Sequence, residues 1–382
     1  MKGPRGVIPV AFVCLLGLGI WTISRNRPLP AASVPQPVAS GHVRPPLKTA
    51  DDEDDFAARE KADREVILRD WEELQRWLHR VPPPSPEEVR TRLKILRNRW
   101  AALDPQVLAE TLRQLLDTHA DAPTGLAFQV GVHGSLEGWP TLRVFLLDVL
   151  AVSDPAAAAE IARMTLEKTS SADEYAVAMR SLTHPGPVRA NDKELLDRFG
   201  VMLAHAGWET QPGFAEAFDL PRAIGSVDAA RTLAAWQGNG TLRRMALEEF
   251  AADHPAAMVA ALASAEGAAL DGSIKADLMA RIDPVDPAQL AAADAYLRNP
   301  ELPAEEAAGF LKTFPLRSAT TGDRLYGEAP APYTHDGIAA GDRAALEQVN
   351  RWLADPEMQR YRADLEPLQA RLATWVDQAG AR

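Results

Sequence analysis

The stretch "WAALDPQVLAETL" (Trp100–Leu112) returns in altered form as "LAVSDPAAAAEIA" (Leu150–Ala162) and "FAADHPAAMVAAL" (Phe250–Leu262). Each copy has a bulky apolar residue, an alanine, two spacers, a polar residue, a proline and then an apolar run; the second copy begins 50 residues after the first, and the third begins 100 residues after the second. An aspartate before a proline is typical of a helix start, because the carboxylate accepts hydrogen bonds from free backbone amides and the proline occupies a position that needs no N–H. The three stretches therefore predict corners at which one helix ends and the next begins.

The pattern is imperfect in its later copies. His254 stands where the first two copies have aspartate, so we expect Asp253 to serve as a substitute cap. A copy near residue 204 lacks the proline. Further helix starts without the full pattern are predicted at Ser171, Asn191, Ser226, Asp286 and Asp355.

The composition agrees with an all-α fold. Hydrophobic residues make up 46% of the chain and aromatic residues only 6%, and alanine and leucine dominate the apolar content, which favours helices. No run shows the period-two alternation of a strand-rich domain. With its corners about fifty residues apart, carried by "WAALDP", "LAVSDP" and "FAADHP", the chain resembles bacterial HEAT-like α-solenoids, which are arrays of antiparallel helix pairs. The resemblance implies a protein-binding scaffold and carries no catalytic residues.

The N-terminal segment predicts a membrane anchor within residues 1–27. Its apolar run, "VIPVAFVCLLGLGIWTI" (Val7–Ile23), is seventeen residues long without a charge and has basic residues on both sides, which is at the short end for a bilayer span. The alternatives are a cleaved signal peptide and a buried helix. The single cysteine, Cys14, lies inside this run, so no intramolecular disulfide is expected. A short basic N-terminus favours an orientation with the body outside the cytoplasm, periplasmic or extracellular.

Residues 28–50 are rich in proline and predict a semi-rigid spacer between this anchor and the helical body. The body is acidic. The whole chain has a net charge of −12, and the first fifty residues contribute six basic and no acidic side chains, so the rest carries −18. Nucleic-acid binders usually present a basic face, and we therefore expect no nucleic-acid partner.

An apolar stripe marks the first helix of the body, predicted from about residue 52 to 80. The stripe consists of Ile67, Trp71, Leu74, Leu78 and Val81, spaced by three or four residues. It is expected to pack against the next helix of the same chain. The alternative is a coiled-coil seam for dimerisation.

The sequence shows no signature of a cofactor or metal site. Its eight histidines include no pair at the spacing that would place two ligands on one helical face. The stretch "VHGSLEG" (Val132–Gly138) has a serine beside a histidine but lacks the spacing of a nucleophile elbow, and predicts a loop between helices. We expect no metal and no cofactor.

One segment departs from the helical pattern. Residues 315–341, "PLRSATTGDRLYGEAPAPYTHDGIAAG", predict a long irregular loop between a helical repeat domain, residues 51–314, and a C-terminal helical pair, residues 342–382. Loops of this length are usually functional or disordered. It gathers groups that can hydrogen-bond or form ion pairs, and our candidates for binding a partner are Arg317, Arg324, Tyr326, Tyr333, His335 and Asp336.

Two hypotheses follow for function. The first is a membrane-anchored, extracytoplasmic helical-repeat scaffold or adaptor that binds another protein. The alternative is a hydrolase or lyase on an all-α scaffold, in which the loop supplies Arg324, Tyr326, His335 and Asp336 to a cleft. A third possibility for the loop is purely structural, as a segment that wraps across the helical array.

Overall fold

The computed structural model describes residues 50–184, 186, 189–317, 322–328 and 333–380, with side chains from residue 55 onward. The chain divides into two units, Met1–Asp52 and Glu53–Arg382. The predicted anchor and nearly all of the predicted spacer lie outside the described residues, and the helical body is the second unit.

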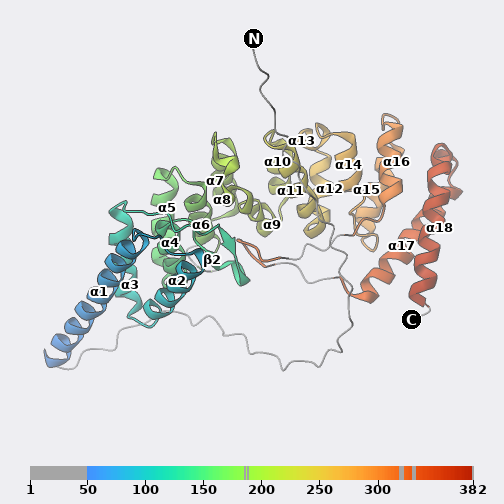
Figure 1. The fold of residues 1–382 in the computed structure, drawn as a ribbon. Helices are drawn as coiled ribbons and strands as arrows, with labels where there is room; N and C mark the ends of the chain where they lie inside the picture. Colours follow the sequence, from blue (N-terminus) through green and yellow to red (C-terminus); the bar gives the residue numbers. More distant parts are fainter. Residues whose placement is uncertain (1–49, 185, 187–188, 318–321, 329–332, 381–382) are drawn as a thin grey trace, which may run out of the picture. The chain divides into compact units, whose positions relative to one another are not determined.

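The second unit is predominantly helical, which confirms the all-α prediction (Figure 1). Its helices are α1 (Ala50–Leu78), α2 (Pro86–Trp100), α3 (Pro105–Asp117), α4 (Leu142–Ser153), α5 (Pro155–Lys168), α6 (Ala172–Thr183), α7 (Asp192–Ala204), α8 (Pro212–Glu216), α9 (Asp219–Ile224), α10 (Val227–Ala235), α11 (Gly240–Asp253), α12 (Pro255–Leu262), α13 (Ala265–Ala268), α14 (Gly272–Met279), α15 (Pro287–Arg298), α16 (Ala304–Thr313), α17 (His335–Ala354) and α18 (Arg362–Gly380). Short 3-10 turns are η1 (Val132–Gly134), η2 (Trp208–Thr210) and η3 (Pro356–Tyr361).

The repeated stretches are helix corners, as predicted. Asp104 accepts hydrogen bonds from the first amides of α3, and Asp154 does the same for α5. The bulky residues that open the three stretches, Trp100, Leu150 and Phe250, are fully buried (0% exposed). The corners at α3 and α5 thus combine a capped helix start with a buried apolar residue, and the corner at α12 has the buried residue.

Side-chain caps also begin the other predicted helices. The capping residues are Ser171 at α6, Asn191 at α7, Ser226 at α10, Asp286 at α15 and Asp355 at η3. The third repeated corner differs from our expectation. His254 precedes α12 without a side-chain cap, and the Asp253 carboxylate forms ion pairs with Arg222 and Arg324 instead of capping the helix.

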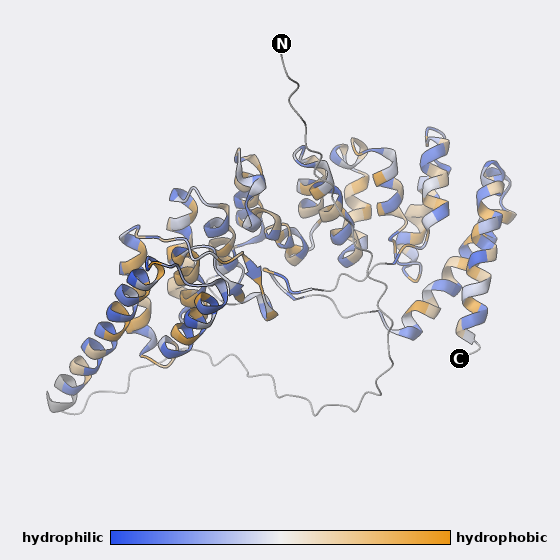
Figure 2. Cartoon of the chain, in the orientation of Figure 1, coloured by the Kyte–Doolittle hydropathy of each residue, from blue (hydrophilic) through white to orange (hydrophobic). Residues whose placement is uncertain are grey.

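Helices pack mainly against partners that are close in the sequence. The closest-packed pairs include α5 with α6, α10 with α12, α14 with α16 and α17 with α18. Figure 2 shows that most of these helices carry both apolar and polar residues. Their buried apolar side chains form two clusters. The N-terminal cluster runs from Ile67 to Leu278 and also includes Leu325 and Tyr326, and the C-terminal cluster runs from Ala276 to Leu372.

The stripe of α1 packs within the chain. Ile67, Trp71 and Leu74 are buried in the N-terminal cluster, so they cannot form a dimer seam at the same time. Val81 lies beyond the end of the helix and is 95% exposed. The predicted stripe therefore ends one turn earlier than its spacing suggested.

A small hairpin replaces the loop that we expected at "VHGSLEG". Strands β1 (Gln129–Val130) and β2 (Leu136–Gly138) pair in antiparallel fashion, and η1 lies between them. His133 and Gly134 have φ values of 56° and 71° within this turn. The hairpin stands between α3 and α4.

The irregular loop is shorter than predicted. Helix α17 begins at His335, where Thr334 accepts a hydrogen bond from the Gly337 amide at 3.1 Å. The seven residues from His335 to Gly341 are therefore helical, and the loop connects Thr313 at the end of α16 to Thr334. At the C-terminal end of the described residues, α17 and α18 pack against each other.

Candidate functional site

The middle of the α16–α17 loop inserts into helices far away in the sequence (Figure 1). We call its described residues, Gly322–Glu328, the tip. Leu325 and Tyr326 are each 1% exposed and belong to the N-terminal cluster, although they follow α16 of the C-terminal cluster in the chain. The tip is a turn, closed by a hydrogen bond from the Arg324 guanidinium to the Glu328 carbonyl and by Gly327 at a φ of 67°.

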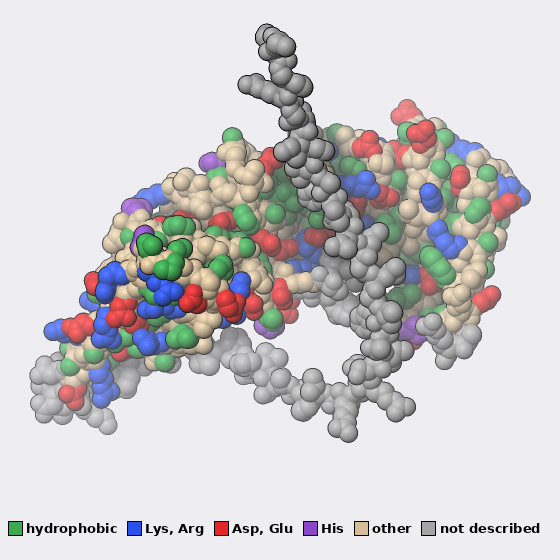
Figure 3. Space-filling view, in the orientation of Figure 1, with side chains coloured by type: hydrophobic (Ala, Val, Ile, Leu, Met, Phe, Trp, Pro, Cys, Tyr) green, Lys and Arg blue, Asp and Glu red, His purple; other side chains and the backbone are tan. Residues whose placement is uncertain are grey.

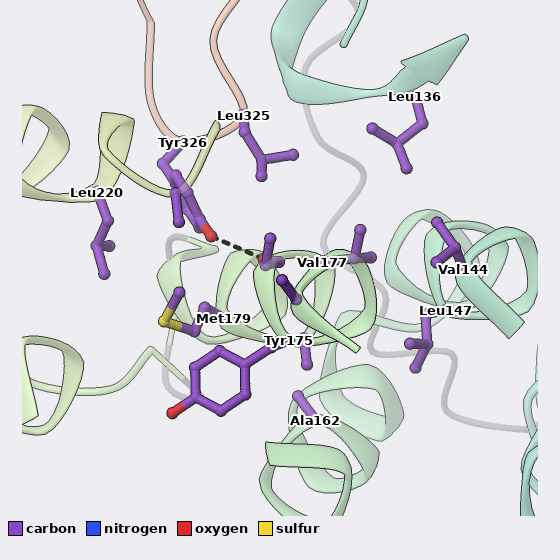
Figure 4. Close-up of a cluster of buried hydrophobic side chains, with 14 of the residues drawn as sticks. Leu136, Val144, Leu147, Ala162, Tyr175, Val177, Met179, Leu220, Leu325 and Tyr326 are labelled. Carbon is purple, nitrogen blue, oxygen red and sulfur yellow. Dashed lines mark hydrogen bonds between the residues drawn. The ribbon is translucent and has the colours of Figure 1, made fainter. Parts of the chain in front are cut away.

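The side chain of Tyr326 is the deepest contact of the tip. Its hydroxyl donates a hydrogen bond of 2.8 Å to the Ala176 carbonyl of α6. Figure 4 shows the ring between Leu220 of α9 and the residues of α6 that surround Ala176. Burial raises the pKa of Tyr326 well above its ordinary value, so the hydroxyl remains a donor at every physiological pH.

Arg324 forms a second contact, which is ionic and buried. Its guanidinium lies 2.9 Å from the Asp253 carboxylate at the end of α11. A second hydrogen bond of 3.2 Å joins the same two groups. Both side chains are almost inaccessible to solvent, and bidentate pairing of this kind fixes the orientation of both groups.

Acidic residues surround this pair. The backbone N–H of Leu325 donates to Asp219 at 3.0 Å. Arg222 contacts Asp219, Glu249 and Asp253 at 3.0, 2.8 and 2.9 Å. Three carboxylates thus pair with two guanidinium groups, one from α9 and one from the tip. Glu216 lies close enough to Asp219 and Glu249 to feel their negative charges.

Two of these carboxyls titrate abnormally. Burial raises the pKa of Glu216 to about 7, and the negative charges of Asp219 and Glu249 add to the effect. Burial also raises the pKa of Asp219, although the Leu325 amide and Arg222 oppose the shift. Glu216 and Asp219 therefore bind protons more tightly than exposed carboxylates do.

A buried carboxylate holds the hairpin against α6. Asp148 of α4 accepts hydrogen bonds from the Trp139 indole at 2.8 Å and from Arg180 of α6 at 2.7 Å. Arg180 also donates to the Gly134 carbonyl in the hairpin turn. A Cβ atom at Gly134 would lie 2.7 Å from the Leu325 carbonyl oxygen, so the turn touches the tip where a larger residue does not fit.

An open pocket of about 510 Å³ lies beside the tip. Ala151, Val152, Pro155 and Ala158 of the α4–α5 corner form its apolar side, and Val152 is 62% exposed. The polar side comes from the hairpin and from the end of α6 and includes His133, Ser135, Arg180, Thr183 and His184. Leu325, Gly327 and Glu328 of the tip complete the wall, so the pocket exists in this form only while the tip is docked.

Of the six predicted partner-binding residues, the structure brings two together in this site, Arg324 and Tyr326. Arg317 pairs with Asp342 of α17 at 2.6 Å. Tyr333 is 49% exposed, and His335 and Asp336 are exposed in the first turn of α17. Within the described part of the chain, neither His335 nor Asp336 forms a hydrogen bond or ion pair with Arg324 or Tyr326, so the structure assembles no catalytic group from this set.

Sequence reasoning missed the acidic cluster and the pocket. One signal was available, because Asp148 is a lone carboxylate in the apolar run "LRVFLLDVLAV" and a charge at such a position needs a partner. The residues that hold the tip offer no such signal. Asp219, Glu249 and Asp253 read as ordinary residues of helix ends and surfaces.

The described residues contain neither a candidate metal site nor a candidate membrane helix. Among them, no group of three or more histidine, cysteine, aspartate or glutamate side chains is placed to hold a metal ion. None of the helices in the described ranges combines the length and apolar character needed to cross a bilayer. No model of a known protein family, no curated protein and no solved structure matches the chain.

Proposed function

We propose that this chain is a membrane-anchored, extracytoplasmic adaptor, built as a HEAT-like array of helix pairs, that binds another protein. We place its recognition surface where the tip docks and at the adjoining side of the pocket formed by the α4–α5 corner, the hairpin and the end of α6. The observation that carries the proposal is the docking of a seven-residue turn into the side of the helical array, far in sequence from the helices that receive it. A surface that holds one short polypeptide segment through named polar contacts has the chemistry to hold another.

The packing pattern supports the repeat architecture. Helices contact mostly partners one to three elements away in the chain, which is typical of arrays in which each repeat touches only its neighbours. The recurring corners at α3, α5 and α12 add to this support. Such arrays commonly present extended binding surfaces.

The pocket has the mixed surface of a binding site. An apolar side and several hydrogen-bonding side chains converge on one cavity, as is usual where a ligand or a partner side chain is held. Elsewhere, Figure 3 shows acidic and basic side chains interspersed over the face formed by α1 and α2, which is typical of a solvated surface.

The proposal of a membrane anchor is based on the apolar sequence Val7–Ile23 and the basic residues on both sides of it. Fractionation of native cells tests it. The full chain is expected in the membrane fraction, resistant to carbonate washing, with the body accessible to protease from outside the cytoplasm. Release by carbonate would remove the anchor from the proposal.

The hydrolase or lyase alternative is less well supported. Tyr326 and Arg324 are committed to Ala176 and Asp253, and His335 and Asp336 lie on another element. A cleft that used all four side chains would need these buried contacts to break.

Site-specific cross-linking tests the adaptor function. A photoreactive amino acid at Val152 on the pocket rim is expected to capture one defined protein from the native membrane. The matched position is Met245, an exposed apolar residue of α11 (53% exposed) that does not line the pocket. Capture of the same proteins from both positions, or of none from Val152, would contradict a partner site at the pocket.

A further inference from the structure

Three consecutive residues make the buried polar contacts between the tip and the array. Arg324 supplies a cation to Asp253, Leu325 a backbone N–H to Asp219, and Tyr326 a hydroxyl to the Ala176 carbonyl. The array side of these contacts consists of Ala176, Asp219 and Asp253, together with Gly134 and Ala223, and we call it the slot.

The slot contains two buried or nearly buried carboxylates, Asp219 and Asp253, and therefore favours an occupant that carries a positive charge. Without the tip, Arg222 would still pair with Asp219, Glu249 and Asp253, but Asp253 would lose the Arg324 guanidinium that lies 2.9 Å from it. Carboxylates that are shielded from water and lack a positive partner are costly. An occupant without an arginine or lysine at this position would leave the Asp253 side of the slot undercompensated.

The shape of the slot restricts the rest of the occupant. The Tyr326 ring fills a fully buried space and its hydroxyl finds an acceptor at the bottom. Gly327 adopts a left-handed conformation, and a Cβ atom there would approach the Ala223 Cβ to 3.3 Å. The Leu325 carbonyl lies against Gly134. The sequence that fits is therefore an arginine, an apolar residue, a tyrosine and a glycine in a tight turn.

We propose that the slot is a recognition site for a short turn of the form Arg-apolar-Tyr-Gly, and that the partner protein presents such a turn and takes the place of the tip of this chain. The identity of the partner as a separate protein rests on the proposed adaptor function. The specificity of the slot is independent of the adaptor function, because it follows from the contacts of the tip and can be measured with a peptide.

In the native chain the tip already occupies the slot, so it competes with a turn from another protein for this site. Its covalent connection gives it an effective concentration of about millimolar, as is usual for segments joined by short linkers. A turn of the same sequence on a separate protein must compete against this effective concentration. Binding should therefore be weak in the native chain and much stronger once the tip loses its own anchors.

A peptide titration tests the specificity. The probe is a fluorescein-labelled peptide, Gly-Asp-Arg-Leu-Tyr-Gly-Glu, which is the sequence of residues 322–328. The full chain with Arg324→Ala and Tyr326→Ala is expected to bind it at least about tenfold more tightly than the unchanged chain. Replacing the arginine or the tyrosine of the peptide by alanine should weaken binding by about tenfold or more. Absence of saturable binding to the folded double variant, or equal binding of all three peptides, would overturn the proposal.

A second variant covers the case in which the double substitution prevents folding. The His133 and Glu328 side chains meet at 3.3 Å and are both exposed, so His133→Cys with Glu328→Cys, in a Cys14→Ser background, can be joined by a bismaleimide whose spacer contains a disulfide, which locks the docked tip until the spacer is reduced. The cross-linked chain should exclude the peptide and the reduced chain should admit it at high peptide concentration. Equal binding in both states would overturn the proposal.

The experiments separate the two proposals. Peptide binding with no cross-linked partner at Val152 would leave the slot assigned and remove the adaptor function. A partner captured at Val152 without peptide binding would support the adaptor function and remove the assignment of the slot. If the double variant instead forms a dimer with the unchanged chain, seen by analytical ultracentrifugation, the occupant is a second copy, and the assignment to a different protein is overturned.

Discussion

Glu216 is an acidic residue at the end of α8 whose environment opposes ionisation. Burial is the main cause of its raised pKa, and the neighbouring charges of Asp219 and Glu249 act in the same direction. A carboxyl whose pKa is raised by folding contributes most to stability when it is protonated in both states. That contribution is lost as the pH rises through the folded-state pKa of about 7.

We therefore expect the melting temperature of the chain to fall between pH 5 and pH 8, measured by circular dichroism. The substitution Glu216→Gln should flatten this dependence, because glutamine stays neutral across the range. Glu209→Gln, in the exposed turn η2, is the matched control and should leave the slope unchanged. A slope that survives Glu216→Gln in full would show that other groups cause it.

Asp148 illustrates a different effect of burial, since it is 0% exposed yet fully engaged. Removing its carboxylate takes the acceptor from the Trp139 indole N–H and the buried counter-charge from Arg180, which keeps its hydrogen bond to the Gly134 carbonyl. We expect Asp148→Ala to lower the free energy of unfolding by about 3–5 kcal/mol. Urea unfolding measures this loss.

The control for Asp148 is Asp228→Ala on α10, which removes an exposed carboxylate paired with Arg231. Its cost should stay within about 1 kcal/mol, because solvent screens exposed ion pairs. Similar costs for the two variants would mean that the buried network is energetically unimportant.

At the level of elements, the helix starts follow from local chemistry. Asp104 and Asp154 each accept two backbone amides while a proline occupies the next position. His254 breaks the rule because its ring lies against Gly225 and bonds to the Arg222 carbonyl at 2.6 Å. The preceding Asp253 is held by two arginines. Tertiary contacts thus override the local pattern at the one corner next to the slot.

Removing a cap should have a local and moderate effect. We expect Asp154→Ala to lower the free energy of unfolding by about 1 kcal/mol, because two amides of α5 lose their acceptor. Glu160→Ala on the exposed face of the same helix should cost less. Thermal unfolding of both variants checks the order, and a larger loss for Glu160→Ala would contradict the capping argument.

At the level of the whole second unit, the tip is a non-local contact in an array of mostly local ones. The tip follows α16 in the chain. The buried residues of α16 belong to the C-terminal apolar cluster, whereas those of the tip pack into the N-terminal cluster. Arrays held by neighbour contacts alone tend to lose cooperativity as they lengthen. A segment that joins distant repeats opposes that tendency.

Weakening this contact should therefore change the form of the unfolding transition. We expect Tyr326→Ala to broaden or split the urea transition, with faster hydrogen exchange in α16 to α18 than in α4 to α6. Tyr333→Ala, an exposed tyrosine of the same loop, should leave the transition as it is. A single transition of unchanged slope in Tyr326→Ala would show that the tip does not couple the two clusters.

The sequence by itself determined the all-α class, most helix starts and the burial of Trp100, Leu150 and Phe250 at the corners. These features depend on periodicity and on caps within a few residues, which a single chain displays directly. It also singled out the loop that carries the tip, from the loss of helical pattern.

Only the tertiary structure decided which loop residues act together. Arg324 and Tyr326 join the slot, whereas His335 and Asp336 belong to α17. The contacts of the tip join residues 71, 106 and 150 positions apart. No local periodicity encodes such pairings, because each depends on how all the intervening helices stack. The pocket and the displaced titration of Glu216 arise from the same long-range packing.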